Sequence, residues 1–564
     1  MLLQIRNILT TLLLLGTFST TAQITYLPFG SEEQHLLDRI ETKNGRLSDS
    51  LFLGNRAISR RDAANYLFGQ KADAYEMRWS NVDHFNINRA LSISSEWAPV
   101  TAATLSNASN GFYKNPANLL QSNNSDFFIA ANPILSFQTL YAPDDERQFL
   151  FSTAQGAELR GRILNKVGFY TSLIHQYEEV PDYINKYIQE WEAIPGRGRY
   201  HKSGNGYTYF LPGFYVDVPL IQDHMNLTVG YDKNFIGDGY RSLFLSDIGA
   251  NMAFVRLRTR IWKLQYQNLF VRLTPQWFAG EPKAQGYKYA TIHHLSMNIN
   301  RWLNVGLFES VTFSRKGHFE FGYLNPIIFY RAVERAMGSP DKVAIGLNAK
   351  ALIAGHWNLY TQILINEFSS KRFVDGSGYW ANKWGLQLGL KYMDAFTLSN
   401  LDLQAEMNLI RPYTYQHNTP KIKGTSMANY THYNQALAHP LGAGFAEFIG
   451  KIRYQPAPRL RFEGQVIYYT QGIDTGAANF GNNIFMNYNT RFSNEGVRLI
   501  NGPKGNYLLA GLNASYEFWP RLFFDLGMDY RRESGAADIL PLQQSLYLHS
   551  GLRLNIARRD FMKY

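Results

Sequence analysis

The sequence predicts an all-β transmembrane barrel of about 18 antiparallel strands, with a small N-terminal helical domain in the periplasm. Three observations carry this prediction: segments that alternate apolar and polar residues with a period of two, an even number of such segments, and connections that are alternately short and long. Bacterial outer-membrane barrels have all three features, because each strand turns one face to lipid and both chain ends stay in the periplasm.

The alternation is clearest in the hairpin 506–531. Its first arm places Leu508 and Leu512 on one face and Asn513 and Glu517 on the other, and the pattern resumes after a two-residue turn. Successive side chains of a strand point to opposite faces, so each arm has one apolar and one polar side. A soluble sandwich would alternate as well, but aromatic residues at the ends of the arms favour a lipid interface.

Composition agrees with a barrel and excludes several other classes. The chain has 564 residues, with 36 Tyr, 37 Phe, 45 Gly and no cysteine, and its mean hydropathy is -0.28. No segment beyond the N-terminus approaches the roughly 20 apolar residues of a membrane-spanning helix. Without cysteine there is no disulfide framework and no thiolate chemistry. The net charge of +11 is dispersed along the chain, which indicates anionic surface partners rather than nucleic acid.

Residues 1–22 have the features of a secretory signal peptide. Arg6 provides the positive start, 8–15 an apolar core, and Thr20-Thr21-Ala22 a cleavage site with small residues. Export combined with a barrel predicts the outer membrane of a Gram-negative bacterium.

The period changes to that of a helix between residues 23 and 97. Helices are expected to begin near Ser31, Ser59 and Asn81. We interpret 23–97 as a helical periplasmic domain, with a helical plug inside the lumen as the alternative. Residues 98–124 are expected to form a linker or a first irregular strand, and the barrel with long extracellular loops is expected over 125–564.

The strand count tests the barrel prediction independently. Short connections such as Trp519-Pro520 are expected in the periplasm, and the long ones, including 233–250, 316–341 and 410–444, outside. The expected strands are 125–140, 148–159, 163–175, 206–218, 224–232, 251–259, 261–272, 288–300, 303–315, 342–352, 357–367, 384–393, 399–409, 445–454, 459–469, 506–518, 521–531 and 543–556.

One strand carries a concentrated basic feature. It is a ladder on a single face, continued after the turn, made of Arg256, Arg258, Arg260 and Lys263. It could bind an anionic glycan or phosphate. Alternatively it could be structural and pair with lumen carboxylates such as Asp402 or Glu463, since interior charges need partners.

Two of the long connections are expected to fold into the lumen. In 316–341, Asn325-Pro326 precedes apolar residues at helical spacing, which predicts a short helix over 327–337 that needs a dry environment. In 233–250, Gly237 and Gly239 indicate tight turns. The sequence therefore predicts an occluded lumen.

These same segments resemble the capsule-assembly Wzi family of outer-membrane proteins. The resemblance rests on Gly237-x-Gly239 followed by Ser242-Leu243-Phe244-Leu245-Ser246, on Leu324-Asn325-Pro326-Ile327-Ile328-Phe329-Tyr330-Arg331, and on Gly338, Asp341 and Gly346-Leu347. Near the N-terminus, Gly30-Ser31, Leu37-Asp38-Arg39 and Ser59-Arg60-Arg61-Asp62 resemble relatives in gliding bacteria, including gliding-motility proteins of the RemB type.

The resemblance covers nearly the whole mature chain and carries expectations about fold and function. It implies an 18-stranded barrel, plugged by its loops, that acts as a lectin and holds capsular polysaccharide on the cell surface. Under this interpretation the plug includes Gly237, Gly239, Asn325, Pro326, Phe329 and Arg331, and Arg241 joins the basic ladder in binding glycan. Phe235-Ile236 departs from the Trp-Gly run that the family commonly has there.

Catalytic motifs do not compete with this interpretation. The sequence has no GxSxG, HExxH or Walker motif. His293 and His294 alternate across a strand, so they do not form a zinc pair. We therefore expect no enzymatic activity, no metal and no cofactor. The Asn- and Tyr-rich loops 413–433 and 479–494 suit sugar binding and equally suit solvated loops.

The expected function is that of a non-enzymatic barrel that anchors surface polysaccharide, with outer-membrane lipid as its surroundings. One alternative is a structural component of a gliding-motility or secretion assembly, whose partners would be other envelope proteins. A second alternative is a diffusion porin, which requires an open lumen. The identity of the glycan and the oligomeric state stay open.

Overall fold

The computed structural model describes residues 25–72, 79–98, 115, 117–124, 126–164, 166–276, 288–315, 319–327, 341–417, 428–476, 478–536 and 538–563. The signal peptide and most of the expected linker lie outside these ranges.

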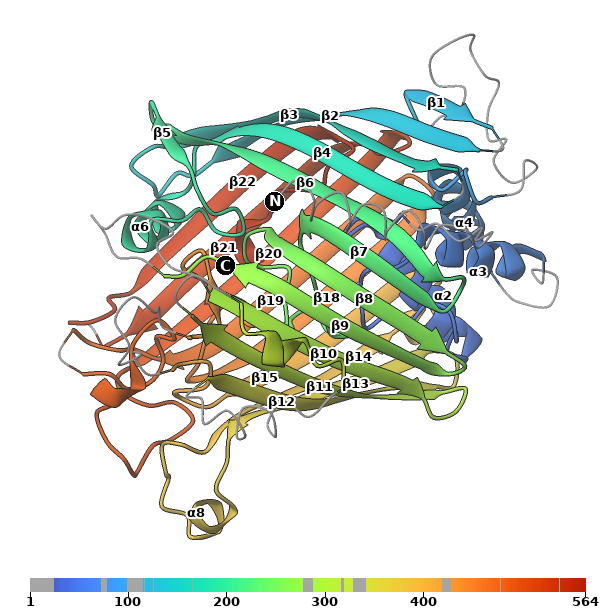
Figure 1. The fold of residues 1–564 in the computed structure, drawn as a ribbon. Coiled ribbons are helices and arrows are strands. Elements are labelled where there is room, and N and C mark those ends of the chain that lie inside the picture. Colours follow the sequence, from blue (N-terminus) through green and yellow to red (C-terminus); the bar gives the residue numbers. More distant parts are fainter. Residues whose placement is uncertain are drawn as a thin grey trace, which may run out of the picture.

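The described chain forms a closed barrel of 18 antiparallel strands (Figure 1). The barrel closes where the last strand pairs with the first, from Leu135 opposite Leu554 to Tyr141 opposite Leu548. The wall consists of β2 (Phe127–Tyr141), β3 (Phe149–Ile163), β4 (Val167–Glu178), β6 (Gly206–Ile221), β7 (Met225–Asp232), β8 (Met252–Ile261), β9 (Leu264–Leu273), β10 (Lys288–Asn298), β11 (Leu303–Ser314), β12 (Lys342–Ile353), β13 (Trp357–Glu367), β14 (Lys383–Tyr392), β15 (Leu401–Ile410), β18 (Phe445–Ala457), β19 (Leu460–Gly472), β20 (Lys504–Trp519), β21 (Leu522–Gly535) and β22 (Gln543–Leu554).

The predicted fold class and strand number are confirmed, and each predicted strand overlaps one of these. Connections such as 262–263, 458–459 and 520–521 lie together at one rim, which we call the short-turn end. The connections 179–205, 233–251, 411–444 and 473–503 lie at the opposite rim, the long-loop end. The chain enters β2 and leaves β22 at the short-turn end, as the even strand number requires.

The outer face of the wall is apolar over most of its circumference. Leu512 is 60% exposed and Phe448 is 51% exposed, and the rings of Trp357 and Tyr392 stack 3.8 Å apart near the short-turn end. Exposed apolar side chains in such a band are stable against lipid and unfavourable against water. No helix in the described ranges has the length and apolar character needed to cross a membrane.

Three helices cover the short-turn end of the barrel (Figure 1). They are α2 (Glu32–Asn44), α3 (Arg60–Ala72) and α4 (Asn81–Ile93). Helix α2 ends at Gly45, whose φ of 59° is left-handed and therefore suits glycine. Ser80 and Asp83 form a complete capping box on α4. The three helices share an apolar core that includes Leu37, Ile40, Leu67 and Leu91.

The remaining helices and strands are short and do not form part of the 18-stranded wall. They are β1 (Leu120–Asn123), α6 (Asp182–Trp191), β5 (His201–Ser203), η2 (Phe321–Leu324), α8 (Ser370–Val374), η3 (Ala395–Thr397), β16 (Thr431–His432), β17 (Gln435–Ala436), η4 (Tyr488–Thr490) and η5 (Phe561–Lys563).

Candidate functional site

The N-terminal helices are joined to the barrel by buried ion pairs. Arg39 of α2 donates to Asp83 at 2.9 Å, to Asp394 at 2.5 Å, and to Asp402 of β15. Burial alone raises the pKa of Asp83, but Arg39 and Lys43 outweigh it and hold this pKa well below its ordinary value. Because removing one partner of a buried pair leaves an uncompensated charge, this network fixes the helices in the mouth of the barrel.

The predicted basic ladder faces this N-terminal segment. The Arg256 guanidinium lies 4.6 Å from the centre of the Tyr26 ring, and Arg258 donates to the carbonyl of Ala57 at 3.2 Å. Arg260 donates to the carbonyl of Ser50 and to Asp62, at 2.7 and 3.0 Å.

The arginines of the ladder therefore contact other residues of this protein, as the structural alternative predicted. Their partners are not the predicted carboxylates Asp402 and Glu463. Asp402 pairs with Arg39, and Glu463 pairs with Arg453 at 2.7 Å. Lys263 lies in the turn between β8 and β9, at the short-turn end.

The 233–250 connection lies inside the barrel, where sequence reasoning placed it. Its apolar residues are fully buried, and the Phe244 ring stacks on Phe308 of β11 with centroids 4.3 Å apart. Both glycines stand at close approaches. A Cβ on Gly237 would come 2.7 Å from the Gln362 side chain, and one on Gly239 would come 2.6 Å from Glu406. At Gly237 the φ of 151° also disfavours a side chain, and at Gly239 a Cβ would come 2.8 Å from the Arg241 carbonyl.

Arg241, a candidate glycan ligand, is part of this internal packing. Its side chain is buried and pairs with Glu447 at 3.3 Å, while its second nitrogen donates to the carbonyl of Lys563 at 2.7 Å. Its backbone N–H donates to Glu406 at 3.0 Å. A polymer at the cell surface does not reach a group held in this way.

The other predicted plug segment has a different location. The described residues 319–327 pack on the outer face of the wall, where Tyr323 meets Val311, Phe313 and Val343. The His293 side chain and the backbone of Asn325 share a hydrogen bond on this outer face. Pro326 is exposed, and Ile327 is 61% exposed.

Asn325 and Pro326 therefore lie outside the lumen. The physical reason is that the outward side chains of β10 and β11 need packing and hydrogen-bond partners from protein. Phe329, Arg331 and nearly all of the helix expected over 327–337 lie outside the described residues.

A C-terminal tail that sequence reasoning missed also fills the lumen. After β22, Asn555 donates to the carbonyl of Pro133 at 2.7 Å, and the chain turns back into the barrel. Arg559 makes two hydrogen bonds of 3.1 Å to Glu178. Met562 is buried among Ile449, Ile467 and Leu509. The only sequence signal for this tail is its paired charges, Arg558-Arg559-Asp560.

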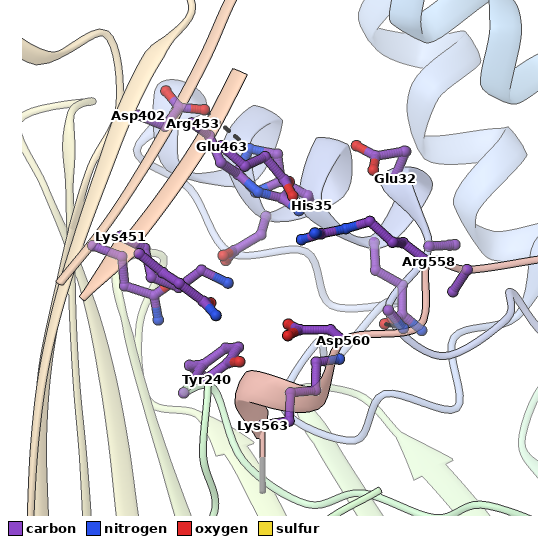
Figure 2. Close-up of a pocket in the computed structure, with 18 of the residues that line it drawn as sticks. Glu32, His35, Tyr240, Asp402, Lys451, Arg453, Glu463, Arg558, Asp560 and Lys563 are labelled. Carbon is purple, nitrogen blue, oxygen red and sulfur yellow. Dashed lines mark hydrogen bonds and ion pairs between the residues drawn. The ribbon is translucent and has the colours of Figure 1, made fainter. Parts of the chain in front are cut away.

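Between these inserted segments lies a polar cavity of about 290 Å³. Helix α2, the 233–250 loop, strands β15 and β18–β21, and the C-terminal tail all line it. Figure 2 shows Tyr240, Lys451, Arg558, Asp560 and Lys563 around the same space. The described lining has charged groups of both signs, so the cavity is a hydrated site rather than an apolar void.

A second group of side chains, of the aromatic and cationic kinds that often contact ligands, lies at the long-loop end. We call it the crown cluster: Tyr379, Trp380, Lys383, Tyr488 and Arg491. The Arg491 guanidinium lies 4.2 Å from the Trp380 ring centre, and the Lys383 amine 4.1 Å from that of Tyr488. Part of the predicted sugar-binding loop 479–494 belongs to it. In the other predicted loop, Tyr413 is buried against Trp380 of the crown cluster, and Tyr415 and Tyr430 are buried in the interior.

Within the described ranges, no group of three or more His, Cys, Asp or Glu side chains is placed to hold a metal ion.

Comparison with known proteins relates the fold to solved barrels. No family model and no curated protein match the sequence. The structure superposes on Wzi of Escherichia coli, described as an outer-membrane protein involved in group 1 capsule assembly and as a carbohydrate-binding β-barrel. The TM-score is 0.55 at 11% identity, over 95% of this chain and 100% of that one.

Two porins from Pseudomonas also superpose, with lower scores. OprD of Pseudomonas aeruginosa has a TM-score of 0.41 at 13% identity, over 76% of this chain and 96% of its own. A BenF-like porin of Pseudomonas fluorescens has a TM-score of 0.41 at 10% identity, over 76% and 99%. At these identities, the similarity to Wzi establishes a common barrel fold and leaves the ligand open.

Proposed function

We propose that this protein is an outer-membrane barrel that binds surface polysaccharide at its long-loop end and holds it there without transporting it. The observation that carries the proposal is the filled lumen. The N-terminal helices cover the short-turn end, and the 233–250 loop and the C-terminal tail lie inside the barrel. Buried ion pairs and apolar packing hold these segments to the wall. A filled barrel of this kind disfavours a diffusion porin, which needs an open lumen.

The crown cluster supplies the chemistry for an acidic glycan. Aromatic rings stack on the apolar faces of sugar rings, and the partly exposed Arg491 attracts carboxylate or phosphate substituents. Lys383 is buried and paired with Glu367 at 2.8 Å, so it supports the aromatic rings and does not contact the glycan. Asn487 and Asn489, beside Tyr488, add amides that suit sugar hydroxyls. The fold shared with a carbohydrate-binding barrel supports this choice of ligand class.

The buried ladder at Arg256, Arg258 and Arg260 has no part in this proposal. Its guanidinium groups are occupied by Tyr26, Ala57, Ser50 and Asp62. Replacing them therefore tests the attachment of the N-terminal segment rather than the binding of glycan.

The experiment compares surface-attached with shed polysaccharide in a deletion strain carrying the wild type or a variant. Arg491→Gln removes the cation over Trp380 and should lower retention several-fold, since a charge-assisted contact is worth about 1.5–3 kcal/mol. Arg498→Gln is the matched control, because Arg498 is an exposed arginine of the same connection. Equal retention by the deletion strain and the wild type would refute the proposal, as would equal losses in the two variants.

A further inference from the structure

Besides Arg56, which donates to the carbonyl of Gly239, the cavity of Figure 2 contains three cationic side chains that no described carboxylate pairs with directly. They are Lys451 of β18 and Arg558 and Lys563 of the C-terminal tail. The Lys451 amine lies 4.0 Å from the centre of the Tyr240 ring, and Arg558 contacts His549 at 3.4 Å. Neighbouring cations are paired: Arg453 with Glu463 at 2.7 Å, and Arg553 with Asp525 at 2.6 Å.

A cation inside a barrel requires compensation by water or by an anion, because its desolvation costs several kcal/mol. The cavity offers room for either. Its volume of about 290 Å³ corresponds to about ten water molecules at the volume each has in the liquid, and it lies near the lower limit of small-molecule sites. The room lies where the three cations converge.

The tail itself places a carboxylate among these cations. The Asp560 carboxylate projects into the cavity and accepts a hydrogen bond from the Met562 backbone N–H at 2.9 Å (Figure 2). Burial raises the pKa of Asp560, but Arg558, Lys563 and Lys451 together lower it below its ordinary value. Three cations are therefore already arranged around a negative charge.

The local charges leave the site one positive charge in excess. Asp529 also lines the cavity, 3.6 Å from His549. With Arg56 and Asp247, four cations face three carboxylates that have no Lys or Arg partner in the described part of the chain, so 4 − 3 leaves one positive charge. The buried Tyr240 hydroxyl has no hydrogen-bond partner among the described residues. It adds a neutral donor beside Lys451.

Toward the short-turn end, the helices and the wall leave little further space beside the cavity. A smaller cavity of about 40 Å³ between α2, α4 and the wall shares Glu32, His35 and Arg453 with it and extends to Asn400 and Gln455, beside the short turns. On the other side, the 233–250 loop and the buried residues of 411–417 and 428–444 separate the cavity from the long-loop end. The site therefore lies on the helix-covered side of the barrel interior.

We propose that this cavity binds a small phosphorylated solute, with Lys451, Arg558 and Lys563 contacting the phosphate and the Tyr240 hydroxyl donating to it. Cationic groups converging with a hydroxyl donor suit the several acceptor oxygens of a phosphate. This function is separate from polysaccharide binding, because packed segments separate the cavity from the long-loop end. A free sugar phosphate and a lipid headgroup present the same chemistry.

Isothermal titration of the purified full-length protein in detergent tests the proposal. The probes are inorganic phosphate, glucose 6-phosphate, uncharged glucose and a short-chain phosphatidic acid. We expect saturable binding of phosphate and glucose 6-phosphate and none of glucose. Lys451→Gln and Lys563→Gln should each weaken binding at least about tenfold, as the loss of a charge-assisted contact does. Asp560→Asn should strengthen it, because it removes the competing carboxylate.

Lys202→Gln, in the exposed strand β5, is the matched control and should leave the affinity unchanged. Heat-resistant migration on gels verifies that each variant retains its barrel. Preferential binding of phosphatidic acid would support the phosphate site and assign it to a headgroup. The proposal is overturned if the wild type shows no saturable binding, if Lys202→Gln weakens binding equally, or if Asp560→Asn weakens it as the lysine variants do. These outcomes are independent of polysaccharide retention.

Discussion

Two long connections that were both expected in the lumen lie on opposite sides of the same wall. Phe244 of the 233–250 connection stacks on Phe308, which projects inward from β11. Tyr323 of the 315–341 connection packs on Phe313 of the same strand with centroids 4.8 Å apart, but on its outer face. Both rings are fully buried. Apolar residues in a loop thus predict that the loop packs against the barrel wall. The residues of the wall determine whether it packs on the inner or the outer face.

In this part of the wall, the usual alternation of outward apolar and inward polar residues is locally reversed. Where the 233–250 loop packs, the inward face of β9–β12 includes the apolar residues Leu269, Ile292 and Ala344, whereas the outward positions of β10 and β11 carry His293 and Glu309. Apolar inward residues favour a dry cover from inside. Polar groups facing lipid require hydrogen-bond partners from protein, since lipid supplies none. The inner loop therefore packs on apolar residues that would otherwise face the lumen. The outer segment packs over polar residues that would otherwise face lipid.

The largest expected effect comes from breaking the inner contact. Phe244→Ala removes a fully buried ring and should lower the free energy of unfolding by about 3–5 kcal/mol. Urea titration of the reconstituted protein, followed by tryptophan fluorescence, measures it. Phe492→Ala, at an exposed loop position, should change this free energy by no more than about 0.5 kcal/mol. Similar effects of the two changes would show that the inner loop is not a packed element.

Sequence reasoning found the barrel because its signals are local. A period of two, turn residues and connection lengths can be read within single hairpins such as 506–531, and the resulting count of strands is confirmed. The helix starts near residues 31, 59 and 81 were also readable, since capping residues act on the next turn of chain. Gly237 and Gly239 were correctly expected in the interior loop.

The remaining features depend on contacts between distant segments. The ladder at Arg256–Arg260 looked available because nothing near it in sequence shows that Tyr26, Ser50 and Asp62 will cover it. The C-terminal tail has no apolar periodicity that would predict its position. It is held in the lumen by the hydrogen bonds of Arg559 to Glu178 and by the burial of Met562. A signal for the outer segment did exist: in β10, Ala290 and Ile292 alternate with Thr291 and His293 against the usual lipid pattern.

A smaller effect is expected from the polar anchor of the inner loop. Glu406 accepts the backbone N–H groups of Tyr240 and Arg241 at 2.7 and 3.0 Å. Glu406→Gln turns one acceptor into a donor that faces a donor, at a cost of about 2–3 kcal/mol. Hydrogen exchange at 237–245 should rise, while exchange at 321–324 stays unchanged.

The matched change on the outer segment is Glu320→Gln, where Glu320 is partly exposed and pairs with Arg315 at 3.3 Å. It should cost less than about 1 kcal/mol and leave exchange at 237–245 unchanged. If both variants release the same residues, the two loops behave as one unit and the comparison between them fails.

An effect of similarly small size is expected at the Tyr323 hydroxyl, the other polar anchor of the outer segment. The Tyr323 hydroxyl donates to Asp341 at 2.7 Å, but Arg315 donates to both oxygens of the same carboxylate at 2.8 and 2.6 Å. Tyr323→Phe therefore removes one hydrogen bond without leaving the carboxylate unpaired, at a cost of about 1 kcal/mol. Hydrogen exchange should rise at 321–324 alone. A rise at 237–245 would show that the wall transmits strain between its faces, and that the two loops are not covered independently.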